Sequence, residues 1–171
     1  MGGLRTGSYT AQYLRNCHWK TTIRLVRLAT DLDLIKLLAL FEVSDVSQFV
    51  RPIEEAKRVW RETMTSDNVF VFVAPLDEVI VATCTLITAP NLLRRGRSHE
   101  FLENVMTHPS YQGRGFGKAV VTEALNYAWE LNCHHVLMQS GRADPKVYGF
   151  YEGLGFKPGL RTGHVALRPA E

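Results

Sequence analysis

The hydrophobic positions of this chain of 171 residues follow two different spacings, which together predict an α+β fold. Apolar side chains three and four positions apart predict amphipathic helices, and short runs rich in β-branched and aromatic residues predict strands. We expect helices at Leu32–Phe41, Pro52–Met64, Gly115–Leu131 and from Asp144 or Pro145 to Glu152. We expect strands at Thr22–Ala29, Val69–Ala74, Val79–Thr88, Glu100–Thr107 and His135–Ser140, with two closing strands at Phe156 and His164–Leu167.

The order of these elements predicts a mixed sheet. The strands on either side of the turn Pro75–Glu78 are expected to form an antiparallel hairpin. The strand, helix and strand between Glu100 and Ser140 predict a right-handed crossover, in which the two strands run parallel. We expect a single domain at residues 21–171, after a flexible N-terminal segment at 1–20.

Composition narrows the classes of function. With 46% hydrophobic and 22% charged residues, the chain is typical of a globular protein. A net charge of +3, without a basic stripe interleaved with aromatics, does not favour a nucleic-acid partner. No apolar run approaches the roughly 20 residues of a membrane span, so we expect no membrane partner. The three cysteines are far apart and lack metal-binding spacing, which predicts reduced thiols in a cytoplasmic protein and no metal site.

The segment Gln112–Lys118 is rich in glycine and lies between a predicted strand and the start of a predicted helix. Backbone N–H groups and the positive end of a helix dipole would converge there, which favours a compact anion such as a diphosphate. A dinucleotide fingerprint starting at Gly113 would need glycine in place of Lys118. A nucleotide phosphate loop ending at Lys118 would need glycine in place of Gln112 and a hydroxyl in place of Ala119. Neither motif fits the spacing.

The pattern that does fit is Gln112-x-x-Gly115-x-Gly117, which resembles the loop signature [RQ]-x-x-G-x-[GA] of the GNAT superfamily of acetyl-CoA-dependent N-acetyltransferases. The loop follows a strand that ends in THP and is followed by a helix, a strand and FYEGLGF, Phe150–Phe156, which is similar to the Y-x-x-x-G-F ending of the family. The resemblance extends over residues 100–157. It implies a GNAT-like sheet that is mostly antiparallel, with a central splayed parallel strand pair and flanking helices.

The resemblance also implies where coenzyme A would bind. The loop would hold the pyrophosphate, and the pantetheine arm would lie between the splayed strands, helped by a β-bulge near Glu103–Val105. Asp144 stands where many members carry an asparagine that contacts the pantetheine, and an ionised carboxylate there can accept a hydrogen bond but cannot donate one. For Arg114 and Lys118 a solvated surface role is an equal alternative. The expected contacts are Val105, Met106, Gln112, Gly113, Arg114, Gly115, Phe116, Gly117, Lys118 and Asp144.

The expected reaction is attack of a neutral amine on a thioester. For an amine with a pKa near 10.4, deprotonation at pH 7 costs about 4–5 kcal/mol, which favours a general base. Glu103 is the best candidate, because it occupies a mid-strand position that would by default be apolar. Glu100 and His99, expected to be more exposed, and the loop residue His108 are weaker candidates. Tyr151 matches the family tyrosine that protonates the departing thiolate.

Two alternatives concern mechanism and activity. Cys84 and Cys133 allow a covalent acetyl-enzyme, but no histidine–aspartate pair accompanies either cysteine in sequence, so direct transfer in a ternary complex is favoured. The second alternative is a non-catalytic acyl-CoA-binding sensor with the same fold, which would not need Glu103 and Tyr151.

The acceptor is expected to be the primary amine of a small molecule. The sequence around Glu103 and Tyr151 is similar to glucosamine-6-phosphate N-acetyltransferases, which makes an amino-sugar phosphate one candidate, while an antibiotic, a polyamine or a peptide or protein amine stays open. Arg94, Arg95 and Arg97 form either a solvated face or a recognition site for a phosphate or carboxylate on the acceptor. A homodimer is also plausible from the edge strands.

Overall fold

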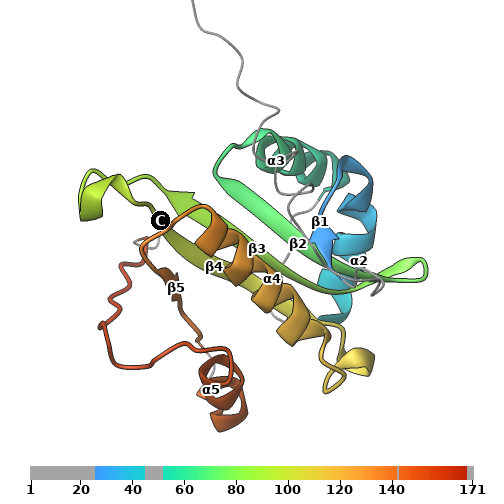
Figure 1. The fold of residues 1–171 in the computed structure, drawn as a ribbon. Coiled ribbons are helices and arrows are strands. Elements are labelled where there is room, and N and C mark those ends of the chain that lie inside the picture. Colours follow the sequence, from blue (N-terminus) through green and yellow to red (C-terminus); the bar gives the residue numbers. More distant parts are fainter. Residues whose placement is uncertain (1–25, 45–51, 142, 169–171) are drawn as a thin grey trace, which may run out of the picture.

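The structure is a computed structural model of the chain, and it describes residues 26–44, 52–141 and 143–168 (Figure 1). The predicted strand residues 22–25 and Cys17 lie outside these ranges. The strands are β1 (Arg27–Leu28), β2 (Val69–Leu76), β3 (Val79–Ala89), β4 (His99–Thr107) and β5 (Val136–Met138). The α-helices are α2 (Leu34–Ser44), α3 (Ile53–Thr65), α4 (Phe116–Glu130) and α5 (Pro145–Glu152), and short 3₁₀ turns lie at Asp31–Asp33, Arg94–Gly96 and Pro109–Tyr111.

The strands form one mixed sheet in the order β1-β2-β3-β4-β5. Neighbouring strands are antiparallel except β4 and β5, which run parallel and are joined through α4. The predicted fold class, with its hairpin and its parallel crossover, is therefore confirmed. Because β5 is the last strand of the described sheet, the parallel pair lies at one edge of it.

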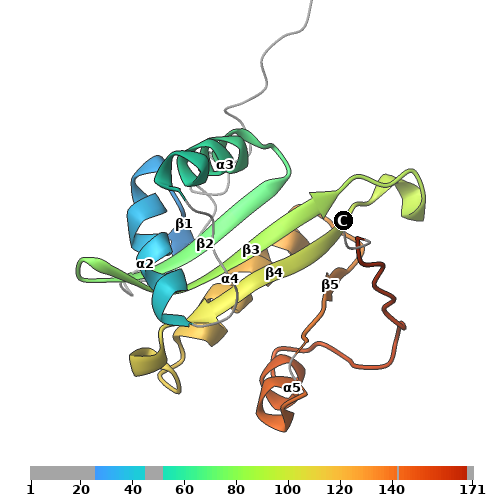
Figure 2. The ribbon, with the colours of Figure 1, turned by 180° about the vertical axis from the view of Figure 1, so that it is seen from behind.

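Helices cover both faces of the sheet (Figures 1 and 2). On one face, α4 packs its buried side against β2, β3 and β4, and the core there includes Phe72, Leu86, Leu102 and Tyr127. On the other face, α2 and α3 lie over the β1–β3 side, where Leu37 and Leu40 pack against Val73 and Ile80. α2 also contacts β4, whereas the part of this second face formed by β5 is not covered by α2 or α3 (Figure 2).

The parallel pair separates halfway along β4. Pairing with β5 ends at Leu102, opposite Met138, although β4 continues to Thr107. The β3–β4 register shifts just beyond this point, because Thr85 pairs with Glu103 but Thr83 pairs with Met106. One extra residue therefore lies in β4, and Asn104 there has a φ of 51°. This β-bulge confirms the bulge predicted near Glu103–Val105, and it bends β4 where the pair opens.

The N-terminal end of the described chain is held by an ion pair between β1 and the turn before α2. Arg27 donates to both carboxylate oxygens of Asp33, at 2.6 and 2.8 Å. The backbone N–H of Thr30 donates to the same carboxylate at 2.7 Å, which forms a capping box. The hydrogen bonds from Arg27 and Thr30 and the charge of Arg27 lower the pKa of Asp33 to about 2, although partial burial acts in the opposite direction.

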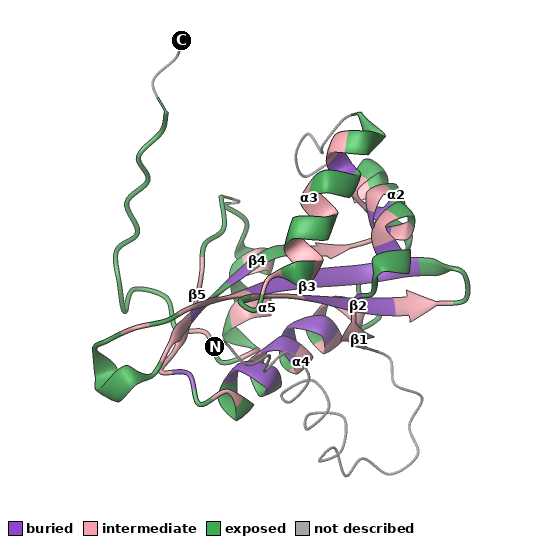
Figure 3. Cartoon of the chain, turned by 90° about the horizontal axis from the view of Figure 1, so that it is seen from above, coloured by how far each residue is buried: buried purple, intermediate pink, exposed green. Residues whose placement is uncertain are grey.

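The closing strands predicted at Phe156 and His164–Leu167 are wrong. Residues 154–168 contain turns and irregular chain but no strand. The alternation of the segment is typical of a strand, yet Val165 is 74% exposed and Leu167 is 85% exposed. Figure 3 shows this part of the chain running away from the sheet as an exposed segment. Without a sheet edge to pair with, an alternating pattern is not sufficient to form a strand.

Within the described ranges, none of the helices is both long and apolar enough to cross a lipid bilayer.

Candidate active site

The glycine-rich loop enters α4 through two glycines in the left-handed region. Gly113 has a φ of 73° and Gly115, the N-cap of α4, has a φ of 89°. Side chains strain the backbone in this conformation, so the sequence needs glycine at both positions. The first backbone hydrogen bond of the helix runs from the Ala119 N–H to the Gly115 carbonyl at 2.9 Å. The N–H groups just before Ala119 therefore point out of the helix end toward an anion.

The third glycine of the loop allows α4 to approach β4 closely. A Cβ atom on Gly117 would lie 2.7 Å from Thr107 Oγ1 and 3.8 Å from the ring of Phe150. The loop is also tied to the end of β4 by Gln112, whose Nε2 donates to the Thr107 carbonyl at 3.3 Å. The predicted motif residues Gln112, Gly115 and Gly117 therefore hold the loop against the strand end and shape its backbone.

Aromatic side chains support the outer side of the loop. Tyr111 stacks edge-on against Phe116 at 6.1 Å between ring centroids, and Arg114 lies over the Tyr111 ring at 5.2 Å. Arg114 and Lys118 are both exposed, so their charges lie in solvent at the loop surface. His108 caps the turn before the loop through Nδ1, which accepts from the Ser110 N–H at 3.2 Å. A structural role for His108 agrees with the expectation that it is a loop residue.

Val105 and Met106 occupy the part of β4 that extends beyond its pairing with β5. Val105 packs against the core cluster beneath α4, and Met106 is half-buried. The predicted pantetheine contacts therefore lie on the opened side of the parallel pair, next to the loop.

The Y-x-x-x-G-F motif, which runs from Tyr151 to Gly155 and Phe156, forms the C-terminal cap of α5. The Phe156 N–H donates to the Tyr151 carbonyl at 3.1 Å, and the Gly155 N–H donates to the Glu152 carbonyl at 3.0 Å. Gly155 has a φ of 92°, as the left-handed position of a Schellman motif requires. The rings of Tyr151 and Phe156 meet at 5.7 Å, which is the hydrophobic contact that accompanies this motif. The sequence pattern therefore fixes the position of Tyr151 through the backbone.

Tyr151 packs against the α4 side of the core, as does its neighbour Phe150, which reaches Gly117. This contact brings α5 to the start of α4. Asp144 is the N-cap of α5, and its Oδ1 accepts from the Lys146 N–H at 2.8 Å. One Asp144 oxygen is therefore used in capping, a role that the sequence pattern had already suggested by placing the helix start there.

The burial expected for the acidic residues of β4 is reversed. Glu103 is exposed, and Glu100 is fully buried. Glu100 accepts from Thr88 Oγ1 at 2.5 Å and from Ser98 Oγ at 3.0 Å, on the face of the sheet that α4 covers. Because side chains alternate along a strand, His99, Phe101 and Glu103 lie on the other face, which is uncovered at this edge. Glu103 makes no hydrogen bond or ion pair with other residues of the described chain.

The two described cysteines are free thiols inside the protein. Burial raises the pKa of Cys84 above its ordinary range, and its thiol donates to the Val120 carbonyl at 3.3 Å. Burial, and then the charge of Glu100, raises the pKa of Cys133 to about 11. Both thiols are protonated near neutral pH, so neither is an activated nucleophile. Among the residues that the structure describes, no group of three or more histidine, cysteine or acidic side chains is placed to hold a metal ion.

Comparison with known proteins agrees with this arrangement. The model of the Acetyltransferase (GNAT) family matches residues 36–156. Over 78 residues the chain is 35% identical to a glucosamine 6-phosphate N-acetyltransferase of Trypanosoma brucei brucei, a match that spans 46% of this chain and 51% of that protein. Over 70 residues it is 33% identical to a spermidine N(1)-acetyltransferase of Vibrio cholerae, spanning 40% of this chain and 38% of that protein.

A solved structure from Agrobacterium tumefaciens str. C58, which carries a provisional acetyltransferase assignment, has the same fold. It superposes with a TM-score of 0.77 and 36% sequence identity, and the match covers 83% of this chain and 99% of that one. Because the family match extends from α2 to Phe156, the chain belongs to the GNAT family of acetyltransferases. The match to the trypanosome enzyme covers only about half of that enzyme's length, and the named activity of that enzyme belongs to the whole protein.

Proposed function

We propose that the protein is an acetyl-CoA-dependent N-acetyltransferase that acts on the primary amine of a small molecule. The observation that carries the proposal is the loop before α4, where Gly113 and Gly115 take positive φ values beside the point at which β4 and β5 separate. The family to which the chain belongs uses acetyl-CoA, and the residues present fit that ligand. Side chains at these glycines would strain the backbone that presents the N–H groups.

The proposed cradle has two parts. The N–H groups of the loop Gln112–Lys118 bind the pyrophosphate of coenzyme A, and the unpaired edge of β4 at Val105 and Met106 binds the pantetheine arm. Gly117 keeps these parts together, because its lack of a side chain lets α4 lie against Thr107. Asp144 contributes one free carboxylate oxygen at most, since the other caps α5.

The proposed chemistry is transfer in a ternary complex. The bound thioester supplies the activated acetyl group. Glu103 accepts a proton from the acceptor amine, directly or through a water, on the uncovered face of β4. The neutral amine nitrogen bonds to the acetyl carbon and passes the proton that it must lose to Glu103, while the bond from carbon to sulfur breaks and Tyr151 donates its hydroxyl proton to the sulfur; Tyr151 then regains a proton and Glu103 releases one through solvent. The protonated, buried state of Cys84 and Cys133 supports direct transfer over a covalent acetyl-enzyme.

The proposed acceptor class is supported by the named relatives and by the exposed surface beside Glu103. Two relatives are named for glucosamine 6-phosphate and for spermidine, which share a primary amine and differ in charge. The uncovered face beside Glu103 leaves room for a soluble amine to approach. We therefore propose that the acceptor is a small amine and that the enzyme acts in the cytoplasm. The homodimer stays a prediction, which light scattering would check.

The experiment that tests this proposal measures release of the coenzyme A thiol from acetyl-CoA in the presence of an amine panel. The panel contains amino-sugar phosphates, polyamines, aminoglycosides and a lysine peptide, and products are identified by mass spectrometry. We expect turnover of at least one small amine, with a rate that rises as pH increases and the amine loses its proton. Binding of acetyl-CoA without turnover of any member would instead support the non-catalytic sensor.

A further inference from the structure

A cluster of histidine and arginine side chains lies where β4 and β5 begin. The rings of His99 and His135 stack with centroids 5.5 Å apart and an interplanar angle of 12°. The Nδ1 atoms of His134 and His135 lie 2.8 Å apart. Backbone hydrogen bonds join the segments that carry these rings, from the His134 N–H to the Ser98 carbonyl at 2.7 Å and from the Glu100 N–H to the His135 carbonyl at 3.0 Å.

Arginines add positive charge to these rings. Partial burial, and then the charges of Arg94, Arg97 and Arg161, lowers the pKa of His134. Burial also lowers the pKa of His135, and the positive charges of Arg161, the two neighbouring histidines and Arg94 lower this pKa further. We call the six residues His99, His134, His135, Arg94, Arg97 and Arg161 the basic cluster.

The basic cluster has no counter-charge of its own in the described chain. Its three arginines form no ion pair with a described acidic residue. The nearby acid, Glu100, is buried on the α4 side and accepts hydrogen bonds from Thr88 and Ser98. Cys133, which also lies close, is protonated. An unbalanced group of cations is unfavourable in the free protein, and it is the arrangement that attracts an anion.

Two ring nitrogens of the cluster are also without hydrogen-bond partners. His99 Nδ1 and His135 Nε2 are buried, and neither has a partner among the described residues. Leaving a buried polar atom unpaired costs about 1–3 kcal/mol, and such atoms often mark a position that an ion or water occupies.

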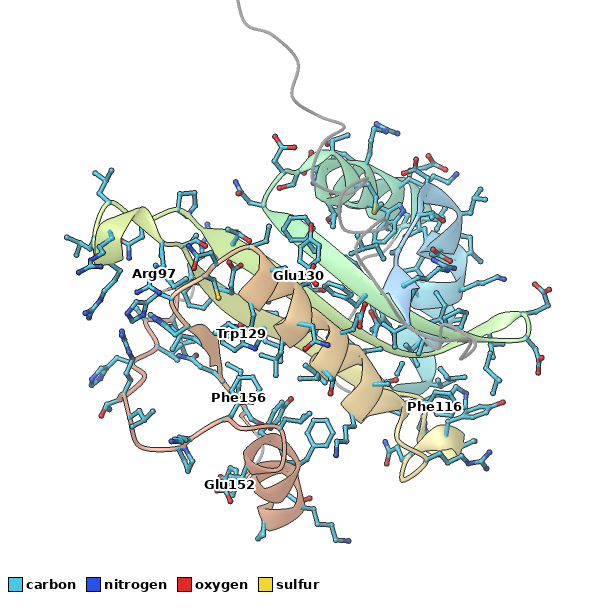
Figure 4. All side chains as sticks on the ribbon, in the orientation of Figure 1. Arg97, Phe116, Trp129, Glu130, Glu152 and Phe156 are labelled. Atoms are coloured by element: carbon cyan, nitrogen blue, oxygen red, sulfur yellow. The ribbon has the colours of Figure 1, made fainter. Side chains whose placement is uncertain are left out.

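The basic cluster is separate from the loop that we assign to coenzyme A. Figure 4 shows Arg97 beside the C-terminal end of α4 and Phe116 at its N-terminal end. The cluster does share a face with the proposed base, because His99, Phe101 and Glu103 are alternate residues of β4. Glu103 lies four positions after His99 along the strand, which corresponds to about 13 Å. Phe101, 36% exposed, forms an apolar surface between them.

We propose that the basic cluster binds the anionic end of the acceptor, so that the enzyme selects elongated amines with a terminal phosphate. The amine would lie at Glu103, the middle of the molecule over Phe101 and the phosphate among the arginines and histidines. This inference rests on the proposed function and specifies its acceptor. A phosphate is favoured over a carboxylate because its three oxygens and greater charge match several donors at once.

The kinetic test uses ω-aminoalkyl phosphates of increasing chain length, each paired with the amino alcohol of the same length. We expect kcat/KM to be higher for the phosphate than for the alcohol, with the largest ratio at the length whose amine and phosphorus are about 10–13 Å apart. Arg97→Gln and Arg161→Gln should each raise KM for that phosphate about tenfold, with little change in kcat or in turnover of the alcohol. Equal kcat/KM for phosphates and alcohols at every length would overturn the proposal while leaving the acetyltransferase activity intact.

A binding test does not depend on turnover. Inorganic phosphate is titrated into the protein saturated with acetyl-CoA, and the histidine ring protons are followed by NMR. We expect phosphate to shift the resonances of His99, His134 and His135, because an anion bound among these rings changes their surroundings. His108 and His164 are internal references. No shift at the three cluster rings, or the same shift in an Arg97→Gln, Arg161→Gln double variant, would contradict the proposal.

A matched control is Arg61→Gln on α3. Arg61 is exposed, and its side chain makes no hydrogen bond or ion pair with other described residues. The variant removes the same charge from the protein without touching the basic cluster. If it raised KM for the phosphate as much as Arg97→Gln does, the effect would be one of net charge and the site assignment would be wrong.

Discussion

Replacement of Gly117 by alanine tests whether close packing of α4 on β4 determines the shape of the loop. The added Cβ would lie 2.7 Å from Thr107 Oγ1, whereas ordinary carbon contacts are above 3.4 Å. Overpacking of this kind costs about 1–3 kcal/mol, and the better helix propensity of alanine returns about 1 kcal/mol. We therefore expect Gly117→Ala to lower the free energy of unfolding by up to about 2 kcal/mol and to raise KM for acetyl-CoA.

A double-mutant cycle isolates the contact. In a Thr107→Ala background the obstructing oxygen is gone, so Gly117→Ala should become neutral or stabilise the protein by about 1 kcal/mol. The assay is urea unfolding of the four proteins at neutral pH. Gly149→Ala is the matched control, because Gly149 lies inside α5 with open space around its Cβ position and should gain stability. Additive effects of Gly117→Ala and Thr107→Ala would refute the packing argument.

Three further predictions follow from the site and the ion pair at the N-terminal end. Tyr151→Phe should lower kcat by about 10²-fold or more with little change in acetyl-CoA affinity, because the variant keeps the ring packing on Phe156 and loses only the hydroxyl. An unchanged kcat would show that Tyr151 is not the general acid. Cys84→Ala and Cys133→Ser should each retain activity, and no acetylated thiol should appear on mixing with acetyl-CoA, whereas a trapped thioester on either residue would establish a covalent pathway. Asp33→Asn should lower the free energy of unfolding by about 1–2 kcal/mol at pH 7, a value that allows for the partial exposure of Arg27. In urea unfolding, this difference from the parent protein should disappear as pH falls from about 4 to 2, because the pKa of Asp33 is lowered to about 2 in the folded state. A constant difference across that pH range would contradict the ion pair.

Local patterns in the sequence were sufficient for most elements of the fold. The spacing of Val120, Ala124 and Tyr127 predicts the buried side of α4, and the structure buries all of them. The runs on either side of Pro75–Glu78 predict the hairpin, although β2 continues to Leu76 and Asp77 takes the turn with a φ of 51°. Turn geometry of this kind depends on register, which composition does not determine.

The sequence could not determine which face of β4 is covered. Phe101 and Leu102 are adjacent apolar residues, so the alternation is compatible with either face pointing inward. The interpretation that placed Glu103 inside was wrong for this reason, because only the position of α4 decides that Leu102 and Glu100 are buried. The basic cluster was only partly visible for a similar reason. Arg94 and Arg97 are prominent in sequence, but the sheet register is needed to bring His99 beside His135.

The same limit applies to the C-terminal segment. His164–Leu167 has the alternation of a strand, but a strand forms only where a neighbouring edge accepts its hydrogen bonds. In the described chain that segment is exposed, and β5 has only three residues, Val136–Met138. By contrast, the Y-x-x-x-G-F pattern was interpretable from sequence because its geometry is local, as the Schellman motif at Gly155 shows.

The central claim is that the loop before α4 binds the pyrophosphate of coenzyme A. Calorimetric titration with acetyl-CoA and with S-acetylpantetheine, which lacks the nucleotide and the pyrophosphate, measures that contribution directly. The unaltered protein should bind acetyl-CoA at least about tenfold more tightly than S-acetylpantetheine. A Gly115→Val variant, whose backbone would be strained at a φ of 89°, should lose most of that preference while keeping its affinity for S-acetylpantetheine. Equal affinity of the unaltered protein for the two ligands, or an unchanged preference in Gly115→Val, would contradict the account.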